Sequence, residues 1–548
     1  MNNVTITFED NTKRVYPNGV SLREVIFDVA SEKEIVCGKF NDLVVGYDDV
    51  INRSGKLSLY GINDAFGNRV YERGLTFLFK VCALDVLGKD TLIKIRHSID
   101  RGIFFEIDKE ITNENLIAIK KMMKERVNKA IPFVKIETTM DEALSYFKSI
   151  NRMDKVKTLF YDKSNYVALY RFDDVYNYVL GDLPGDTSIL KYFDLTLIKG
   201  KGIILRYPSI YDNGKIVKYT HHEQYFNSID EYLEWAKILN ISSIGELNDA
   251  IVSSKKGEII NLAETIQDFR LHEIAKQIKD NKEDIKFILL SGPSSSGKTT
   301  TSRKLSLYLK TMGYNPVPIS LDDYFLNREE TPLTPDGKYD FESLRAIDVK
   351  LFNNQMTKLL KGNKVIAPTF DFVEGKKIFN KPLQLKENDL LIVEGLHALS
   401  EELLKEIPRK KKFKIYISPL VFLNIDDDNR INLTDIRLLR RMTRDNRTRG
   451  YNPAKTLASW ADVRSGEEKY VFPYQDNADV VFNTFLVYEL AVLKAYAEPL
   501  LHQVTEDDEQ YFTAVRLIKL LDMVLPIPSE DVPSISILRE FIGNSYFE

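Results

Sequence analysis

The stretch with the clearest chemical meaning is a glycine-bounded loop just past the middle of the 548-residue chain. Gly292, Gly297, Lys298 and Thr299 fit the spacing G-x-x-x-x-G-K-[ST], between an apolar run and a helical one. In such a loop, backbone N–H groups bind phosphate oxygens, while the lysine and the hydroxyl serve the terminal phosphates and Mg²⁺. We therefore expect ATP and Mg²⁺ here. The residues expected to bind the nucleotide are Gly292, Pro293, Ser294, Ser295, Ser296, Gly297, Lys298, Thr299 and Thr300.

Two further apolar runs each end in acidic residues. The first ends in Asp322 and Asp323, and the second ends in Glu394. In a parallel sheet the strand ends face the ligand, so Asp322 could accept a proton from a substrate hydroxyl, and Glu394 could hold Mg²⁺. Acidic residues also suit turns and helix caps, and for the adjacent pair that alternative is equally well supported by the local sequence.

An arginine-rich segment follows, "DIRLLRRMTRDNRTRGYN" from 435 to 452. On a helix its arginines cover more than half of the circumference, and only Asp435 and Asp445 oppose them. Arginines of this kind stabilise the charge that develops on a phosphoryl group during transfer. Contact with an RNA backbone is the alternative use of the same side chains.

The pattern of strands and helices expected around these residues predicts a multidomain chain of α/β and α+β type. Strand, glycine loop and helix alternate over 285–505, which is typical of a parallel sheet flanked by helices. Before it we expect a small mixed sheet over 1–60, an α+β region over 61–225 and a helical linker over 226–284. A helical extension follows over 506–548.

The bulk composition excludes several classes of protein. The formal charge is -4, so no global positive field indicates nucleic-acid binding. Two cysteines, Cys37 and Cys82, cannot build a disulfide framework or a cysteine zinc cluster. No signal peptide or membrane-spanning apolar run is seen. We expect a cytoplasmic protein that binds no membrane.

The motifs of the second half, in their order, resemble the uridine kinase and phosphoribulokinase family. The resemblance covers about 286–501 and is carried by "GPSSSGKTT", "LDDYF", "YDFESLRAID", "PTFDFVEGKK", "VEGLHAL" and "RRMTRDNRTRG". It implies a P-loop kinase fold with Asp322 as the base, Lys298 and Thr299 at the phosphates and Mg²⁺, and Glu394 near the metal. The arginines that it places around the phosphates are Arg441, Arg444 and Arg449.

The acceptor pocket implied by this resemblance is where the chain departs from the family. The pocket would be formed by Glu342, Phe370 and Phe372, but uridine kinases carry Asp and Tyr at the first two positions. Gly375 stands where a histidine would contact the pyrimidine, and Tyr451 replaces an arginine after the lid glycine. His397, close to Glu394, either contacts substrate or serves packing. The resemblance therefore implies phosphoryl transfer but leaves the acceptor open.

The first half resembles two domains of threonyl-tRNA synthetase. Residues 1–60 are similar to the β-grasp TGS domain, and 61–225 to the second additional domain, through "FEDNTKRVYPNGVSLREVIFDVA", "IKIRHSIDRGIFFEI" and "LTLIKGKGIILRYP". That second domain edits with an H-x-x-x-H pair and a later Cys and His. Here Arg73 and Phe77 occupy the histidine positions, and "YVLGDLPGD" contains neither Cys nor His. We expect an editing-like fold without editing activity.

Three hypotheses follow. The leading one is an ATP-dependent kinase that phosphorylates a hydroxyl of a nucleoside (uridine- or cytidine-like) or a related small metabolite, with Asp322, Lys298, Arg441 and Arg444 as catalytic residues. The second is an RNA-associated or regulatory switch whose front half binds RNA or protein. In the third, the front half senses a ligand for the kinase. Self-association into a homo-oligomer is left open by the sequence.

Overall fold

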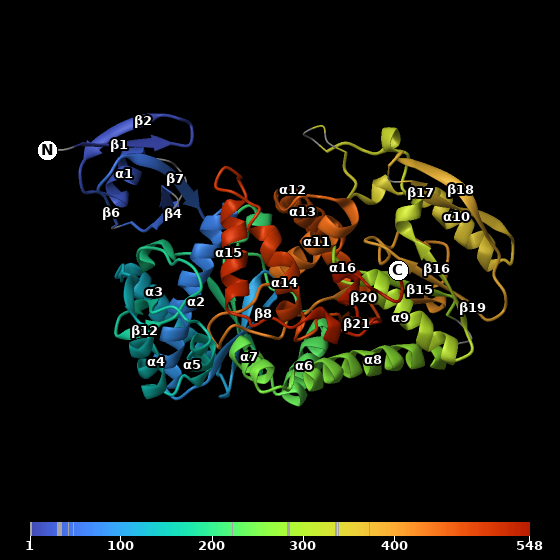
Figure 1. Ribbon diagram of the computed structural model, residues 1–548, viewed down its shortest axis with the longest axis horizontal. Coiled ribbons are helices and arrows are strands. Elements are labelled where there is room, and N and C mark those ends of the chain that lie inside the picture. Colours follow the sequence, from blue (N-terminus) through green and yellow to red (C-terminus); the bar gives the residue numbers. More distant parts are fainter. Residues whose placement is uncertain are drawn as a thin grey trace. The chain divides into compact units, whose positions relative to one another are not determined.

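The computed structural model describes residues 3–29, 35–41, 43–47, 49–221, 223–281, 285–334, 337, 339–371 and 373–548. They divide into two compact units. Unit 1 holds the described residues up to 221, together with Ser243–Gly245 and Asn424–Arg430. Unit 2 holds the described residues of 222–242, 246–423 and 431–548. Figure 1 shows the elements of both units.

Unit 1 begins with a mixed five-stranded sheet of order β2-β1-β7-β4-β5. Along β1 the buried Val4 and Ile6 alternate with more exposed residues, so one face of the sheet packs against α1, whose Leu22 and Val25 are buried. This is the β-grasp arrangement predicted from the sequence. The elements are β1 (Asn3–Phe8), β2 (Lys13–Pro17), β3 (Val20–Ser21), α1 (Leu22–Val29), β4 (Ile35–Phe40), β5 (Leu43–Val45), β6 (Val50–Ile51) and β7 (Gly55–Gly61).

The rest of unit 1 is an α+β region around the long helix α2. Its core joins α2 to an antiparallel sheet of order β13-β14-β9-β8, and a smaller sheet of order β10-β11-β12 follows. The core is rich in aromatic contacts, such as Phe79 against Phe105. The helices are α2 (Ala65–Leu87), α3 (Asn113–Asn128), α4 (Met140–Ser149) and α5 (Met153–Phe160). The strands are β8 (Ile93–Ile99), β9 (Gly102–Ile107), β10 (Val134–Thr139), β11 (Tyr166–Phe172), β12 (Val175–Asn177), β13 (Asp194–Ile198) and β14 (Gly202–Arg206).

A cluster of buried charges ties the segment Asn424–Arg430 into unit 1. Lys155 Nζ lies 3.1 Å from Asp426 Oδ2 and 2.9 Å from Asp428 Oδ2, and the Lys155 and Asp426 side chains are fully buried. Arg152 Nη2 lies 2.7 Å from Asp428 Oδ2, and Lys80 also pairs with Asp428. Each charge therefore has a partner of the opposite sign, which buried charges require.

Unit 2 is built on a five-stranded parallel sheet of order β16-β19-β15-β20-β21. Every residue of β15 and β20 is buried, as expected for strands covered on both faces. Helix α9 packs against β15, β16 and β19, and the long α8 runs beside α9 (Figure 1). The strands are β15 (Phe287–Ser291), β16 (Asn315–Ser320), β19 (Asp389–Glu394), β20 (Lys412–Ser418) and β21 (Val480–Asn483). The parallel sheet flanked by helices confirms the fold class predicted for this region.

The other elements of unit 2 surround this sheet. A two-stranded hairpin, β17 (Val365–Asp371) and β18 (Lys376–Leu383), projects beside α10. The helices before α11 are α6 (Glu223–Leu239), α7 (Ile244–Val252, whose first two residues belong to unit 1), α8 (Lys256–Asp280), α9 (Lys298–Thr311) and α10 (Val349–Leu360). The remaining helices are α11 (Leu433–Arg449), α12 (Pro453–Ala458), α13 (Trp460–Tyr470), α14 (Glu489–Leu501), α15 (Tyr511–Asp522) and α16 (Arg539–Ile542).

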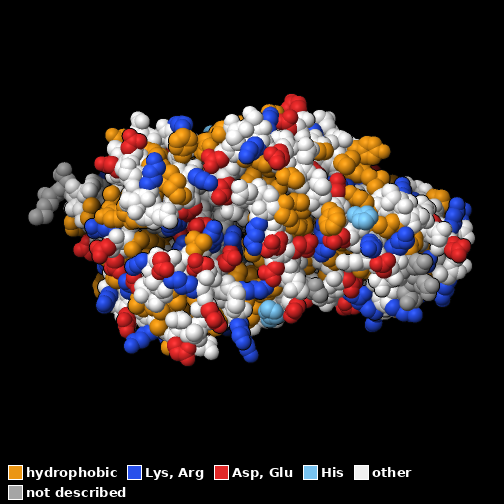
Figure 2. All heavy atoms as spheres, turned by 90° about the horizontal axis from the view of Figure 1, so that it is seen from below, with side chains coloured by type: hydrophobic (Ala, Val, Ile, Leu, Met, Phe, Trp, Pro, Cys, Tyr) orange, Lys and Arg blue, Asp and Glu red, His pale blue; other side chains and the backbone are white. Residues whose placement is uncertain are grey.

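The surface carries charges of both signs. On the face shown in Figure 2, basic and acidic side chains are interspersed rather than gathered by sign. Within the described ranges, no helix combines the length and the apolar character needed to cross a bilayer.

Candidate active site

The predicted phosphate-binding loop, residues 292–300, comprises the segment between β15 and α9 and the first three residues of α9, and it needs its two glycines. A Cβ at Gly292 would collide with the carbonyl oxygen of Ile417. Gly297 has φ +85°, in the left-handed region that favours glycine, and ends the loop as the N-cap of α9. The loop can therefore approach the neighbouring strand closely and turn its N–H groups inward. Such a loop at a helix N-terminus favours anions.

The side chains of this loop are arranged as in an anion site. Lys298 Nζ donates to the carbonyl oxygens of Gly292 and Pro293, at 3.0 Å each. Burial lowers the pKa of Lys298, although nearby carboxylates oppose this effect. The buried hydroxyls of Ser295 and Ser296 have no hydrogen-bond partner among the described residues. A phosphate group would supply acceptors for the lysine and for these hydroxyls.

Glu394 lies at the end of β19, next to the loop. The Thr299 hydroxyl donates to Glu394, with Oγ1 lying 3.2 Å from Oε2 and 3.3 Å from Oε1. Burial, with the nearby Asp322 and Glu540, raises the pKa of Glu394 to about 7. A hydroxyl and a carboxylate side by side fit Mg²⁺, which usually takes one or two protein oxygens and completes its shell with water and substrate phosphates. Among the described residues no group of three or more His, Cys, Asp or Glu could hold a metal by itself.

The adjacent Asp322 and Asp323 have different surroundings. They lie on a short 3₁₀ turn, Leu321–Tyr324, directly after β16, which pairs with β19 so that Ser320 is opposite Glu394. Asp323 Oδ1 accepts the backbone N–H of Phe370 at 3.3 Å, which is a structural contact. The Asp322 side chain is solvent-accessible, yet burial among protein atoms raises its pKa, with Lys298 opposing the shift. Asp322 is thus the member of the pair that lies near the loop lysine.

The arginines of α11 separate into two sets. Arg437 and Arg440 are fully buried and form ion pairs with Glu467 and Glu489. Arg437 Nε also donates to the carbonyl oxygen of Ser294 at 2.9 Å, and Glu467 Oε1 accepts the N–H of Ser294 at 2.8 Å. This pair therefore holds one loop residue by both of its backbone groups. Sequence reasoning missed Glu467, because no motif marks it.

The other set contains the three arginines expected at the phosphates. Arg441, Arg444 and Arg449 all pair with the buried Asp445, at 3.3, 2.9 and 3.3 Å. Arg441 Nη1 donates to the Ser294 hydroxyl at 2.8 Å. The positive charges of Arg449 and Arg444 act to lower the pKa of Asp322, so these arginines lie near the strand ends. One buried acid gathers the three guanidinium groups beside the loop.

Two of the expected acceptor residues, Glu342 and His397, lie close together. Burial, and the nearby Glu467 and Asp322, raise the pKa of Glu342 to about 7. His397 is buried, and burial lowers its pKa to about 4 although a hydrogen bond with the Glu342 backbone opposes the shift. The half-buried Phe370 contacts Phe325, with ring centroids 5.7 Å apart. Phe372 lies outside the described residues.

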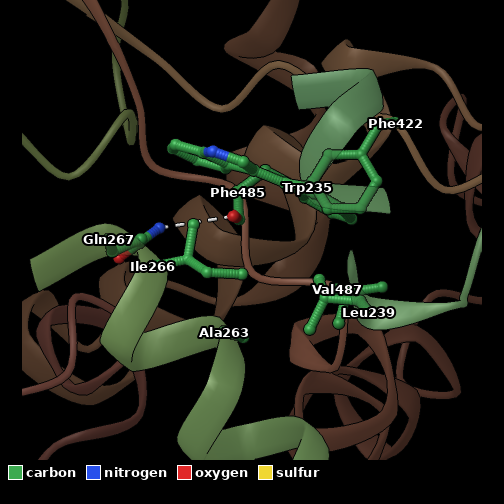
Figure 3. Close-up of a pocket in the computed structure, with 8 residues that line it drawn as sticks. All are labelled: Trp235, Leu239, Ala263, Ile266, Gln267, Phe422, Phe485 and Val487. Atoms are coloured by element: carbon green, nitrogen blue, oxygen red, sulfur yellow. Dashed lines mark hydrogen bonds between the residues drawn. The ribbon is translucent and has the colours of Figure 1, made fainter. Parts of the chain in front are cut away.

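A separate pocket in unit 2 carries no chemistry of this kind. Figure 3 shows its lining, in which the polar side-chain groups are the indole nitrogen of Trp235 and the amide of Gln267, whose Nε2 donates to the Phe485 carbonyl oxygen at 3.3 Å. The lining residues are Trp235, Leu239, Ala263, Ile266, Gln267, Phe422, Phe485 and Val487. None of their side chains ionises near neutral pH, so this pocket supplies no acid–base group.

In unit 1, the positions compared with editing histidines serve the fold. Arg73 Nε donates to the carbonyl oxygen of Asp182 at 2.8 Å, and its guanidinium lies against Gly181. Phe77 is buried, and its ring centroid lies 6.0 Å from that of Phe133. Neither side chain can act as a metal ligand or as a general base at neutral pH.

A glycine-bounded loop beside strand-end carboxylates and an arginine-rich helix is the arrangement expected of a nucleotide site of the kinase type. Residues 287–491 match the model of the Phosphoribulokinase / Uridine kinase family, and the C-terminal region contains a domain of this family. The match supports ATP-dependent phosphoryl transfer of the kinase type.

Individual relatives match the two halves of the chain separately. A uridine kinase from Deinococcus deserti is 27% identical over 194 residues, which cover 35% of this chain and 84% of the relative. A threonine–tRNA ligase from Delftia acidovorans is 30% identical over 206 residues, which cover 36% of this chain and 32% of the relative, so only about a third of that enzyme's length is matched. The N-terminal region provides the ligase match.

Among solved structures, a Bacillus stearothermophilus protein described as a possible uridine kinase aligns with 39% of this chain and 97% of its own. The sequence identity is 18% and the TM-score is 0.28.

Proposed function

We propose that this protein is a kinase that transfers the γ-phosphate of ATP to a hydroxyl of a nucleoside or a related small metabolite. The observation that carries the proposal is the grouping of Asp322, Lys298 and the Thr299–Glu394 pair at the ends of neighbouring parallel strands. A base, a phosphate-binding cation and a metal-binding pair in one place are the parts that phosphoryl transfer needs.

Each group has a role in this reaction. Asp322 accepts the proton of the acceptor hydroxyl as its oxygen attacks the γ-phosphorus, and the bond to the β-phosphate oxygen breaks so that ADP leaves. Lys298 and the arginines Arg441, Arg444 and Arg449 neutralise the charge that develops on the phosphoryl oxygens. Bound at Thr299 and Glu394, Mg²⁺ would supply further charge neutralisation at the β- and γ-phosphates.

The surroundings of Glu342 favour an acceptor with hydroxyls and a flat ring. A carboxylate of raised pKa can exchange hydrogen bonds with hydroxyls, and Phe370 with Phe325 presents aromatic surface. Gly375 has φ +70°, and a Cβ there would lie 2.9 Å from Arg328 atoms, so a pyrimidine-contacting histidine does not fit at this position. The proposed acceptor is therefore a nucleoside or a related small metabolite. The proposed location of the enzyme is the cytoplasm.

The test is a screen of nucleosides and phosphorylatable metabolites for stimulated ADP release by the full chain. With the best acceptor, Asp322→Asn should lower turnover by about 10²- to 10⁴-fold while ADP affinity stays nearly unchanged, because the base is lost and the loop is intact. Asp323→Asn is the matched control, since an amide oxygen can still accept the Phe370 N–H. Equal effects of the two substitutions would show that Asp322 is not the base.

The threonine–tRNA ligase match favours a second candidate, an RNA-associated or regulatory switch. In that case the N-terminal region would bind tRNA with a steep salt dependence, and no small metabolite would stimulate ATP consumption. Filter binding of tRNA between 50 and 200 mM salt distinguishes the two. The net charge of -4 favours the kinase.

A further inference from the structure

A glutamate from outside the family match occupies part of the phosphate-binding loop. The Thr300 backbone N–H donates to Glu540 Oε2 at 3.0 Å. Thr300 is the third residue of α9, where N–H groups have no partner within the helix and are the ones that phosphate oxygens use. Glu540 belongs to α16, whereas the family match ends at residue 491. A carboxylate thus lies where the phosphate-binding loop would hold a phosphate oxygen.

The segment that carries Glu540, residues 536–548, is fixed against the loop and α11. A Cβ at Gly297 would lie 2.6 Å from Ile537 Cγ2, so this isoleucine covers the loop glycine. The Arg440 guanidinium lies over the Phe541 ring, 5.0 Å from its centroid. Arg447 Nη2 lies 2.6 Å from Glu548 Oε1 and also donates to the Glu540 carbonyl oxygen at 3.3 Å. Backbone, apolar and ionic contacts all hold the carboxylate in place.

The charge of Glu540 acts on the groups that serve the nucleotide. It acts to raise the pKa values of both Lys298 and Glu394, so its carboxylate lies near both. A nucleotide phosphate bound in this loop would meet a second negative charge at the same N–H group. Two anions at one donor repel each other strongly, so a nucleotide phosphate and the Glu540 carboxylate compete for the Thr300 N–H.

We propose that Glu540 is an internal anion that holds the α9 N-terminus in place of a nucleotide phosphate, so that nucleotide binding must displace the 536–548 segment. This inference concerns the nucleotide-binding step and rests on the proposed function only for the identity of the ligand. A ligand's apparent affinity is lower when fewer molecules have an open site. The segment therefore lowers the nucleotide affinity of the whole chain by keeping part of the sites closed.

The first experiment measures the dissociation constant of ADP, without acceptor, by calorimetry on the full chain. Glu540→Ala should bind ADP about tenfold more tightly than the natural chain, as expected when a site closed nine-tenths of the time is freed. Glu530→Ala, at an exposed position shortly before α16, should leave the affinity unchanged. Unchanged or weaker binding by Glu540→Ala would overturn the inference, and weaker binding would indicate that Glu540 contacts the nucleotide itself.

The second experiment needs no variant. Hydrogen exchange of the natural chain should become faster in residues 536–548 when ADP is added, because the segment is released, and slower in residues 292–300. Protection of both segments would overturn the inference. If the affinity shift is found but no acceptor is phosphorylated, only the proposed function fails. If an acceptor is phosphorylated and Glu540→Ala binds ADP like the natural chain, only this inference fails.

Discussion

Both units contain clusters of buried or crowded charges, and the clusters differ in how their charges are paired. In unit 1, Lys155 lies within 3.1 Å of both Asp426 and Asp428, and all three side chains are almost fully buried. In unit 2, Asp322, Glu342 and Glu394 all have raised pKa values. In the first cluster each of these charges has a partner of opposite sign, whereas burial and neighbouring acids raise the pKa values of the acids in the second.

This difference distinguishes charged residues that stabilise the fold from those suited to catalysis, which the number of charges in a cluster does not. A buried ion pair with matched partners specifies how chain segments pack, and removing one partner is costly because the other stays buried. Acids that are crowded by burial and by one another have pKa values near neutrality and are candidates for proton transfer or metal binding. The arginines of helix α11 differ in burial in a similar way, since Arg437 and Arg440 are fully buried in ion pairs whereas Arg441 and Arg444, which share Asp445, are partly exposed.

The largest effect should come from breaking the paired cluster of unit 1. Lys155→Met leaves Asp426 and Asp428 buried with less positive charge, so we expect a loss of about 3–5 kcal/mol in the free energy of unfolding. Lys148→Met, an exposed lysine on α4, is the control and should change the stability by less than about 0.5 kcal/mol. Urea unfolding followed by circular dichroism measures both. If the Lys155→Met and Lys148→Met variants were equally stable, the cluster would not stabilise the fold.

A similar loss is expected in unit 2 when the pair behind the loop is broken. Glu467→Ala leaves the guanidinium of Arg437 buried without its carboxylate, at a cost of about 3 kcal/mol in the free energy of unfolding. It also frees the Ser294 N–H, so ADP affinity should fall by about tenfold or more. Glu509→Ala, at an exposed position, should alter neither quantity. A variant of normal stability and ADP affinity would show that the pair does not position the loop.

The fold class, and the place of the glycine-bounded loop between a strand and a helix, could be predicted because their signals are local. The glycine spacing at Gly292 and Gly297 and the apolar runs before the acids each fall within about ten residues, and the parallel sheet confirms the fold class drawn from them. Relatives of both halves likewise confirm the two resemblances, to kinases and to threonyl-tRNA synthetase.

The features of the site that could not be predicted from the sequence depend on contacts between segments far apart in the chain. The charge pattern of α11 does not tell Arg437, which pairs with Glu467 thirty residues later, from Arg441, because both are arginines on one helix. The contact between Thr300 and Glu540 joins residues separated by 240 positions and has no motif. The contact of Asp323 with the Phe370 N–H, which joins residues 47 positions apart, likewise has no motif, so the resemblance could point to Asp322 but not to the structural contact of its neighbour.

A smaller, pH-dependent effect should mark the crowded acids. The pKa of Glu342 is about 7 in the folded protein, above its value in an unfolded chain, so the wild-type loses stability as pH rises from about 4.5 to 7. Glu342→Gln cannot ionise and escapes this loss. Relative to the wild-type, the variant should therefore gain about 1–3 kcal/mol in the free energy of unfolding between pH 5 and pH 8. Parallel stability curves over this range would contradict the raised pKa.

The smallest effect on stability should come from Arg449, and it gives the sharpest test of the division within α11. Its side chain is 48% exposed and shares Asp445 with Arg441 and Arg444, so Arg449→Ala should cost less than about 0.5 kcal/mol in the free energy of unfolding. Turnover with the best acceptor should nevertheless fall by about tenfold or more, because a positive charge at the transferring phosphate is lost. Arg303→Ala, exposed on α9, should leave both unchanged. If Arg449→Ala were stable and fully active, the charge at the end of α11 would have no part in phosphoryl transfer, and the arginines that act there would be those closer to Ser294.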